Sequence, residues 1–170
     1  MIGFIKSFAV VIVTSVLVGS TQGQSSIVIN ELLASNSQGA KDPQGQYDDW
    51  IELHNTSGAT ADVGGMYLTD DAENPTRWRI PSGTTIASKG YLLIWADGDT
   101  TQTGLHAGFR LSASGDEIAL FDTDGRTRLD HVSYGPQTSD VSFGRYPDGT
   151  GDFRLMGYPT PGQQNVVVYE

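Results

Sequence analysis

The chain has 170 residues, which suits one domain with a sizeable core, and its hydrophobic content of 38% is that of a globular protein. A formal net charge of -10 argues against nucleic-acid binding, because such a chain repels phosphate backbones. No cysteine is present, which excludes disulfides, thiolate nucleophiles, cysteine-type zinc sites and the lipid-bearing cysteine of a bacterial lipoprotein.

Residues 1–23 carry the pattern of a secretory signal peptide. Lys6 supplies the charged n-region, and residues 8–18 form an apolar run that is too short to span a bilayer comfortably. Thr21 and Gly23 suit the last positions before a cleavage site, so we predict cleavage after Gly23. An N-terminal membrane anchor is the alternative. The cleaved chain keeps 20 acids against 9 bases, a net charge of -11, and no integral membrane span.

The mature domain, residues 24–165, shows β-strand patterning without helical periodicity of useful length. The expected strands are 27–33, 48–55, 66–69, 78–80, 84–86, 91–96, 117–122, 128–134 and 142–146. Asp124-Gly125 between two alternating runs predicts a hairpin, and the apolar run 91–96 predicts a central strand buried on both faces. The pattern predicts an all-β sandwich or barrel of roughly eight to ten short strands. Residues 166–170 form a short apolar tail without a predicted place.

The second predicted strand combines groups that one strand does not easily accommodate. Trp50, Ile51 and Leu53 favour burial, whereas Asp49 and Glu52 need partners if they are buried. Strand alternation puts Ile51 and Leu53 in the core between the sheets and Trp50 with Glu52 on the opposite face. We expect Trp50 to pack under a crossing loop.

Two interpretations of the acids in this strand remain open. In the first, Asp49 and Glu52 are held by backbone amides or by an arginine such as Arg145, and they stabilise the fold. In the second, Glu31, Asp49, Glu52 and Asp71 contribute to a cation site.

Recognisable catalytic motifs are absent: the sequence has no Gly-x-Ser-x-Gly, no His-Glu-x-x-His and no phosphate-binding glycine loop. His54 and His131 lie inside predicted strands, where a half-exposed strand residue is commoner than a base. His106 lies in a loop near Asp97 and Asp99, and it is the candidate for a His-dependent hydrolase. A hydrolase with paired carboxylates stays open because acids are plentiful.

Acidic loops offer oxygen ligands of the kind that calcium prefers. The candidate loops are 70–74, 97–99, 122–125 and 148–152. None completes an EF-hand pattern, since Arg126 occupies the third oxygen position of the third loop. The alternative is ordinary turn chemistry, because Asp and Gly are common in tight turns.

Ordered motifs along the chain resemble the lamin tail domain family. They occupy residues 27–36, 49–55, 62–70, 80–86, 89–92, 115–120, 144–149 and 159–165. Their structural motif residues are Asn30, Glu31, Asn36, Asp49, Trp50, Glu52, Asn55, Gly144, Arg145, Pro161 and Gly162. The resemblance implies an immunoglobulin-like β-sandwich over nearly the whole mature chain, and it brings no agreed catalytic residue.

In animal lamins this domain is nuclear and meets chromatin and protein partners. The export signal and the acidity of this chain are instead similar to the secreted bacterial branch, whose domains accompany extracellular enzymes or surface proteins. We therefore expect a non-catalytic secreted or cell-surface module, extracellular or periplasmic. Its expected partner is a protein or surface polymer and not nucleic acid, and no cofactor is expected. A calcium-stabilised extracellular binding module is the alternative, and a carboxylate- or His-dependent hydrolase is a more remote one.

Overall fold

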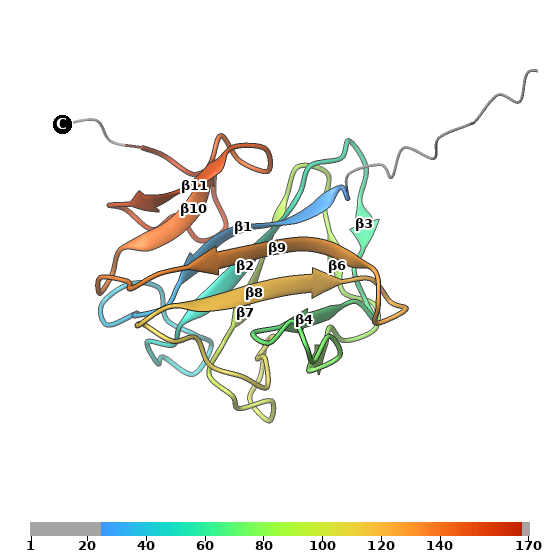
Figure 1. Cartoon of the computed structure of the whole chain (residues 1–170), viewed down its shortest axis with the longest axis horizontal. Helices are drawn as coiled ribbons and strands as arrows, with labels where there is room; N and C mark the ends of the chain where they lie inside the picture. Colours follow the sequence, from blue (N-terminus) through green and yellow to red (C-terminus); the bar gives the residue numbers. More distant parts are fainter. Residues whose placement is uncertain (1–24, 168–170) are drawn as a thin grey trace, which may run out of the picture.

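The computed structural model describes residues 25–167, and within this range it contains eleven β-strands (Figure 1). The predicted signal peptide, residues 1–23, lies outside the described residues, as does the end of the tail. No helix in the described part of the chain is long and apolar enough to cross a membrane.

Two antiparallel sheets build the sandwich. The first has the order β11-β10-β1-β2-β7, formed by β1 (Ile27–Leu33), β2 (Trp50–Asn55), β7 (Tyr91–Trp95), β10 (Ser142–Tyr146) and β11 (Asp152–Met156). The second has the order β5-β4-β8-β9, formed by β4 (Tyr67–Thr69), β5 (Trp78–Arg79), β8 (Asp116–Phe121) and β9 (Arg128–Tyr134). β3 (Ala61–Asp62) and β6 (Thr85–Ile86) pair separately. This architecture confirms the predicted all-β sandwich.

The core lies between the two sheets. Ile51 and Leu53 of β2 are fully buried in one cluster with Ile118 and Leu120 of β8, which confirms the inward face predicted for β2. Trp50 faces the other way and packs with Leu33 and Trp95. Ala40 packs against them from the loop between β1 and β2, residues 34–49, which we call the crossing loop. The alternation of β2 therefore serves two separate apolar clusters, one on each face.

β7 is an edge strand, so the prediction of a central strand is wrong. Its apolar composition has another cause: Ile94 faces the inter-sheet core, whereas Leu93 and Trp95 pack with Trp50 on the opposite face. Its end is covered by a loop, where the Trp95 amide donates to the Leu105 carbonyl at 2.8 Å. Hydrophobic periodicity indicates that both faces of a strand are buried, but it does not indicate whether the strand has a hydrogen-bonded neighbour on each side.

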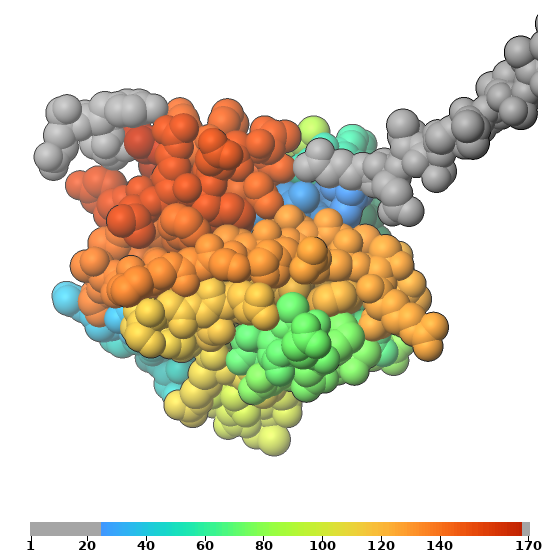
Figure 2. Space-filling model, in the orientation of Figure 1, coloured from blue at the N-terminus to red at the C-terminus, as the bar shows by residue number. Residues whose placement is uncertain are grey.

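The predicted hairpin is confirmed: β8 pairs with β9, and Gly125 in the turn has a φ of 64°, which favours glycine. β3 and β11 were not predicted. β3 has only two residues, and β11 buries only Met156 fully, so neither gives a strong pattern. Figure 2 shows the β10–β11 hairpin as an orange-to-red cap at one end of the molecule, above β9.

Candidate functional site

Glu31 and Glu52 form a buried glutamate pair on the first sheet. They are direct partners in the β1–β2 register, and both are 0% exposed. The register shifts between Ile29 and Glu31. This bulge keeps Ile29 and Leu32 in the core and turns Glu31 to the opposite face, next to Glu52. A local irregularity of β1 thus brings the two acids together.

Donors from the C-terminal part of the chain surround the glutamate pair. We call residues 157–165 the closing segment. Glu31 accepts hydrogen bonds from the Ser142 hydroxyl at 2.5 Å and from the Thr160 amide at 3.1 Å. Glu52 accepts from the Asn30 side-chain amide at 3.2 Å and from the Gly162 amide at 2.5 Å. The acids therefore fasten the closing segment to β1 and β2. The amide of Gly162 is a partner of the kind that the first interpretation predicted for Glu52.

Burial decides the protonation of this pair. Burial raises the pKa of Glu52 to about 8, against the opposing effect of the hydrogen bonds from Gly162 and Asn30, and the charge of Glu31 adds to the rise. Burial likewise raises the pKa of Glu31, against the hydrogen bonds of Ser142 and Thr160. Glu52 is consequently mostly protonated at neutral pH, which removes most of the repulsion between the two side chains.

The last two family motifs of the sequence, residues 144–149 and 159–165, meet at this pair. The Asn165 side chain donates to the Arg145 carbonyl at 2.9 Å, and the Gly149 amide donates to the Asn30 side chain at 3.0 Å. Gly144 is required by space, because a Cβ there would lie 2.7 Å from the Asn165 side chain and 3.1 Å from that of Glu31. These motif residues act by closing the sandwich.

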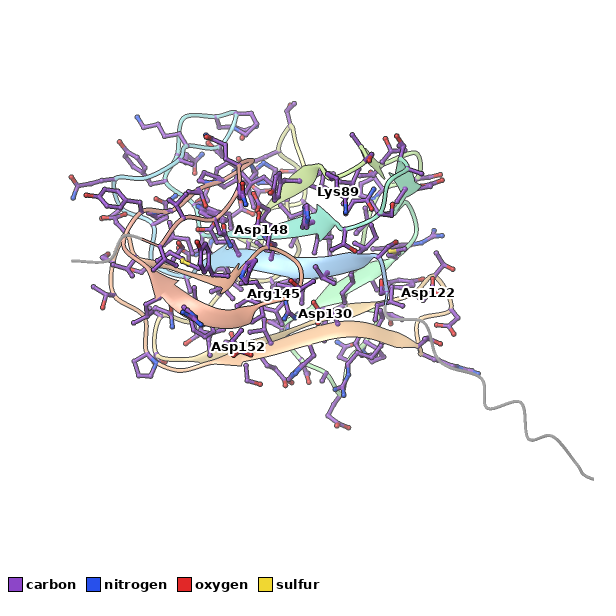
Figure 3. All side chains as sticks on the ribbon, turned by 90° about the horizontal axis from the view of Figure 1, so that it is seen from above. Lys89, Asp122, Asp130, Arg145, Asp148 and Asp152 are labelled. Carbon is purple, nitrogen blue, oxygen red and sulfur yellow. The ribbon has the colours of Figure 1, made fainter. Side chains whose placement is uncertain are left out.

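Arg145 does not hold Asp49 or Glu52; of the two kinds of partner predicted for these acids, backbone amides are the ones found. Its guanidinium pairs with Asp130 of the other sheet at 2.9 Å and donates to the Ile29 carbonyl at 2.9 Å. Figure 3 shows Arg145 and Asp130 lying side by side. The reason is strand alternation: Gly144 is opposite Glu31, so the next side chain of β10 points to the other face.

The other motif residues satisfy backbone groups. Asp49 accepts the Asn36 amide at 2.9 Å, and the Asn36 side chain donates to the Asp48 carbonyl at 2.7 Å. The Asn55 side chain donates to the Ile86 carbonyl at 3.0 Å. The first two contacts lie within the loop between β1 and β2, and the third joins the ends of β2 and β6. Pro161, in turn, immediately precedes Gly162, whose amide binds Glu52.

The four-residue cation site considered from the sequence is not formed. Glu31 and Glu52 come together, but Asp49 lies before β2 at the Asn36 loop, and Asp71 follows β4 of the other sheet. Within residues 25–167, no three His, Asp or Glu side chains are arranged to hold a metal ion. Sequence proximity misled here, because Asp49 and Glu52 are three strand positions apart.

The acidic loops proposed for calcium mainly show turn chemistry. Asp71, Asp99 and Asp124 each accept the amide two residues further on, at 3.1, 3.0 and 2.8 Å. Asp148 accepts the Asn165 amide at 3.1 Å and the Tyr91 hydroxyl.

His106 is buried and bonded through both ring nitrogens. Nδ1 lies 2.8 Å from Asp97 Oδ2, and Nε2 lies 3.2 Å from the Thr103 carbonyl oxygen. Both ring nitrogens therefore face oxygen atoms of the chain itself. The ring is 3% exposed, which leaves it out of reach of a substrate proton.

The other two histidines also lack a catalytic arrangement. The same nitrogen of His131, Nε2, faces Glu117 at 3.0 Å and Ser133 at 3.5 Å, whereas a triad needs the acid and the nucleophile on different nitrogens. His54 Nδ1 lies 3.0 Å from the Gly90 carbonyl oxygen, and the ring stacks on Tyr91.

A polar cavity of about 280 Å³ opens beside the Asp97–His106 pair. Its lining residues are Tyr47, Asp48, Asp49, Ala96, Asp97, Arg110 and Leu111. A second cavity of about 430 Å³ lies between the crossing loop and the closing segment, lined in part by Ala40, Pro159 and Pro161. The first cavity is the candidate recognition site, because it gathers three carboxylates, a guanidinium and the exposed ring of Tyr47.

Sequence reasoning missed several residues of these sites. Thr160 and Asn165 stand inside the closing motif but carried no assigned role. Asp130 and Asp42 had no signal beyond their charge. Asp42 precedes Pro43 in a loop, a common turn sequence, and nothing in the sequence places it against Asp48.

Comparison with known proteins agrees with this geometry. The family model described as the Lamin Tail Domain matches residues 20–136, which is more than half of the chain, and no curated protein matches it. β10, β11 and the closing segment lie beyond the matched range. The chain therefore belongs to the lamin tail domain family and has its all-β, immunoglobulin-like fold.

Proposed function

We propose that the chain is a non-catalytic module, secreted or displayed at the cell surface, that binds a protein or a surface polymer. The observation that carries this proposal is that the two buried glutamates bind groups of the chain itself. Glu31 and Glu52 are 0% exposed and bind the closing segment, so no substrate reaches them. The residues that define the family motif are occupied with stabilising the fold.

The histidines support the same conclusion. His106 is 3% exposed and contacts acceptors through both nitrogens, and His131 presents one nitrogen to both of its partners. A general base needs a free lone pair within reach of a substrate proton. The buried ring of His106 does not meet this requirement in the folded chain.

The surface loops are then the candidates for binding a partner. The polar cavity is lined by Asp48, Asp49, Asp97 and Arg110, beside the exposed ring of Tyr47. With an overall charge of -10, the chain favours a partner that supplies positive charge or hydrogen-bond donors. The predicted signal peptide supports an extracellular or periplasmic location.

Two measurements test the proposal. The full mature chain, residues 24–170, is incubated with polysaccharide, nucleic-acid and phosphoester substrates beside the His106→Ala and Glu52→Gln variants. We expect no turnover above that of the variants; turnover by the wild type that disappears in either variant contradicts the proposal. Binding to isolated envelope polymer and to proteins of the culture fluid is then measured for the wild type and for Tyr47→Ala. We expect the variant to bind more weakly while melting at the same temperature.

A calcium-stabilised form of the same module is the second candidate function. The observation that favours it lies outside the predicted calcium loops: two buried carboxylate oxygens, on Asp42 and Asp48, have no hydrogen-bond donor.

A further inference from the structure

Two loops meet next to the polar cavity. The Gln44 side chain donates to the Thr103 carbonyl at 3.0 Å, which joins the loop of residues 42–48 to the loop of residues 97–106. Asp42 and Asp48 belong to the first loop, and the Asp97–His106 pair belongs to the second. We call Asp42 and Asp48 the aspartate pair.

Each member of the aspartate pair keeps one oxygen without a donor. Asp42 is 5% exposed; its Oδ1 accepts the Gln44 amide at 3.0 Å and the Gln46 amide at 2.6 Å, but its Oδ2 has no partner. Asp48 Oδ2 is also buried without a partner. The two carboxyl groups lie within hydrogen-bonding reach of each other, where ionised carboxylates offer only acceptors.

Two facing carboxyl groups without donors are satisfied by a proton on one of them or by a bound cation, and a cation at the junction of the two loops can serve both at once. Asp97 adds a third charge nearby, and its own oxygens are already bonded to His106 and to the Asp99 amide. The unpartnered oxygens of the aspartate pair are almost inaccessible, which favours a single small ion over a bulky guanidinium group. Hard divalent cations prefer carboxylate oxygen, and calcium tolerates irregular loop geometry better than magnesium does.

We propose that Asp42 and Asp48 bind a calcium ion at the junction of the two loops, with main-chain carbonyls and water completing its coordination. Only two protein carboxylates take part, which agrees with the absence of any three-residue cluster within residues 25–167. A site with so few charged ligands belongs in the weak class of extracellular calcium modules, with a dissociation constant of roughly 0.1–1 mM. This deepens the calcium alternative and rests on ion binding alone, so turnover or partner data that refute the proposed function leave it standing.

Thermal melting of the EDTA-treated mature chain at pH 7, with and without 10 mM calcium chloride, tests the site. We expect calcium to raise the melting temperature of the wild type by roughly 3–10 °C. Asp48→Asn should abolish this rise, because the variant loses one of the two carboxylates. Asp152→Asn, which removes an equal charge at an exposed position of β11, should keep it.

Loss of folding cannot produce the expected result. The new amide of Asp48→Asn can donate to Asp42 Oδ2, so the variant should melt no lower than the calcium-free wild type. Calorimetric titration with calcium should show binding to the wild type and none to the variant. No calcium-dependent rise in the wild type, or an equal rise in Asp48→Asn, overturns the proposal.

Discussion

The molecule brings together two pairs of carboxyl groups, the glutamate pair and the aspartate pair, and supplies them with donors very differently. The glutamate pair receives the amides of Thr160 and Gly162 together with side-chain donors. The aspartate pair leaves two oxygens without a donor. The glutamate pair lies on paired strands under a segment that brings its own amides, whereas Asp42 uses the amides of its loop on one oxygen only. The difference lies in the number of hydrogen-bond donors and not in the residue type. An acid with enough donors stabilises the closed fold, whereas an acid without them is a candidate for ligand binding.

Truncation of Glu52 should give the largest effect on stability. Glu52→Ala leaves the Gly162 amide and the buried Asn30 side chain without this acceptor, and we expect it to lower the free energy of unfolding by about 3–5 kcal/mol. Glu52→Gln should cost only about 1 kcal/mol at pH 7, since the glutamine resembles a protonated glutamate in shape and charge. Urea unfolding of both variants measures the difference. Equal losses would mean that Glu52 acts as an ion.

The pH dependence of stability should be the next largest effect. The folded-state pKa of Glu52, about 8, lies above its ordinary value of 4.5, so its contribution is full below pH 4.5 and is lost as the pH rises to about 8. We expect the free energy of unfolding to fall by on the order of 3 kcal/mol across this window. Urea titrations at each pH measure it, and Glu52→Gln should flatten the curve. A wild-type curve that is already flat would contradict the buried protonated acid.

Acids in the turns limit stability at the other end of the pH scale. Hydrogen bonds from their own turns hold the pKa values of Asp99 and Asp124 below the ordinary range, and hydrogen bonds from Ser37 and Gln38 of the β1–β2 loop do the same for Asp140. Their contribution is present above their ordinary pKa and is lost as the pH falls. Maximal stability should therefore lie at mildly acidic pH.

Removal of Arg145 should give an intermediate loss. Arg145→Ala deletes the pair with Asp130, the bond to the Ile29 carbonyl and the cover over the Phe153 ring, and we expect a loss of roughly 2–3 kcal/mol. Arg154→Ala on the adjacent strand is the matched control, because this arginine is exposed, and it should change stability by less than about 0.5 kcal/mol. Similar losses in both variants would show that the inter-sheet pair has no special part in stability.

Asp48→Asn should give the smallest effect, and one of opposite sign. In calcium-free buffer it relieves the facing carboxylates, and we expect a gain of roughly 0.5–1 kcal/mol. Chemical unfolding in the presence of EDTA measures this gain. A clear loss of stability would show that Asp48 already has a donor in the folded chain.

The sequence predicts the features that depend on local pattern. Strand alternation places Ile51 and Leu53 correctly, Asp124-Gly125 predicts the hairpin, and the need of buried acids for partners leads to the backbone amides that hold Asp49 and Glu52.

Features that depend on pairing between distant segments were not predicted. The bulge in β1 decides the face of Glu31, and the β1–β10 register turns Arg145 towards Asp130. The edge position of β7 is set by the order of the strands in the sheet, and the amino-acid composition of β7 does not reveal that order. Asp42 and Asp48 meet through the path of a loop that has no periodicity to interpret.

Amide hydrogen exchange of Thr160 and Gly162 tests most directly whether the glutamate pair closes the fold. Both amides donate to buried carboxyl groups, so the wild type should protect them well beyond the amide of the exposed residue Gln164. Glu52→Ala should remove the protection of Gly162, and Glu31→Ala should remove that of Thr160. Exchange of both amides in the wild type at the rate of an unstructured chain would contradict the account.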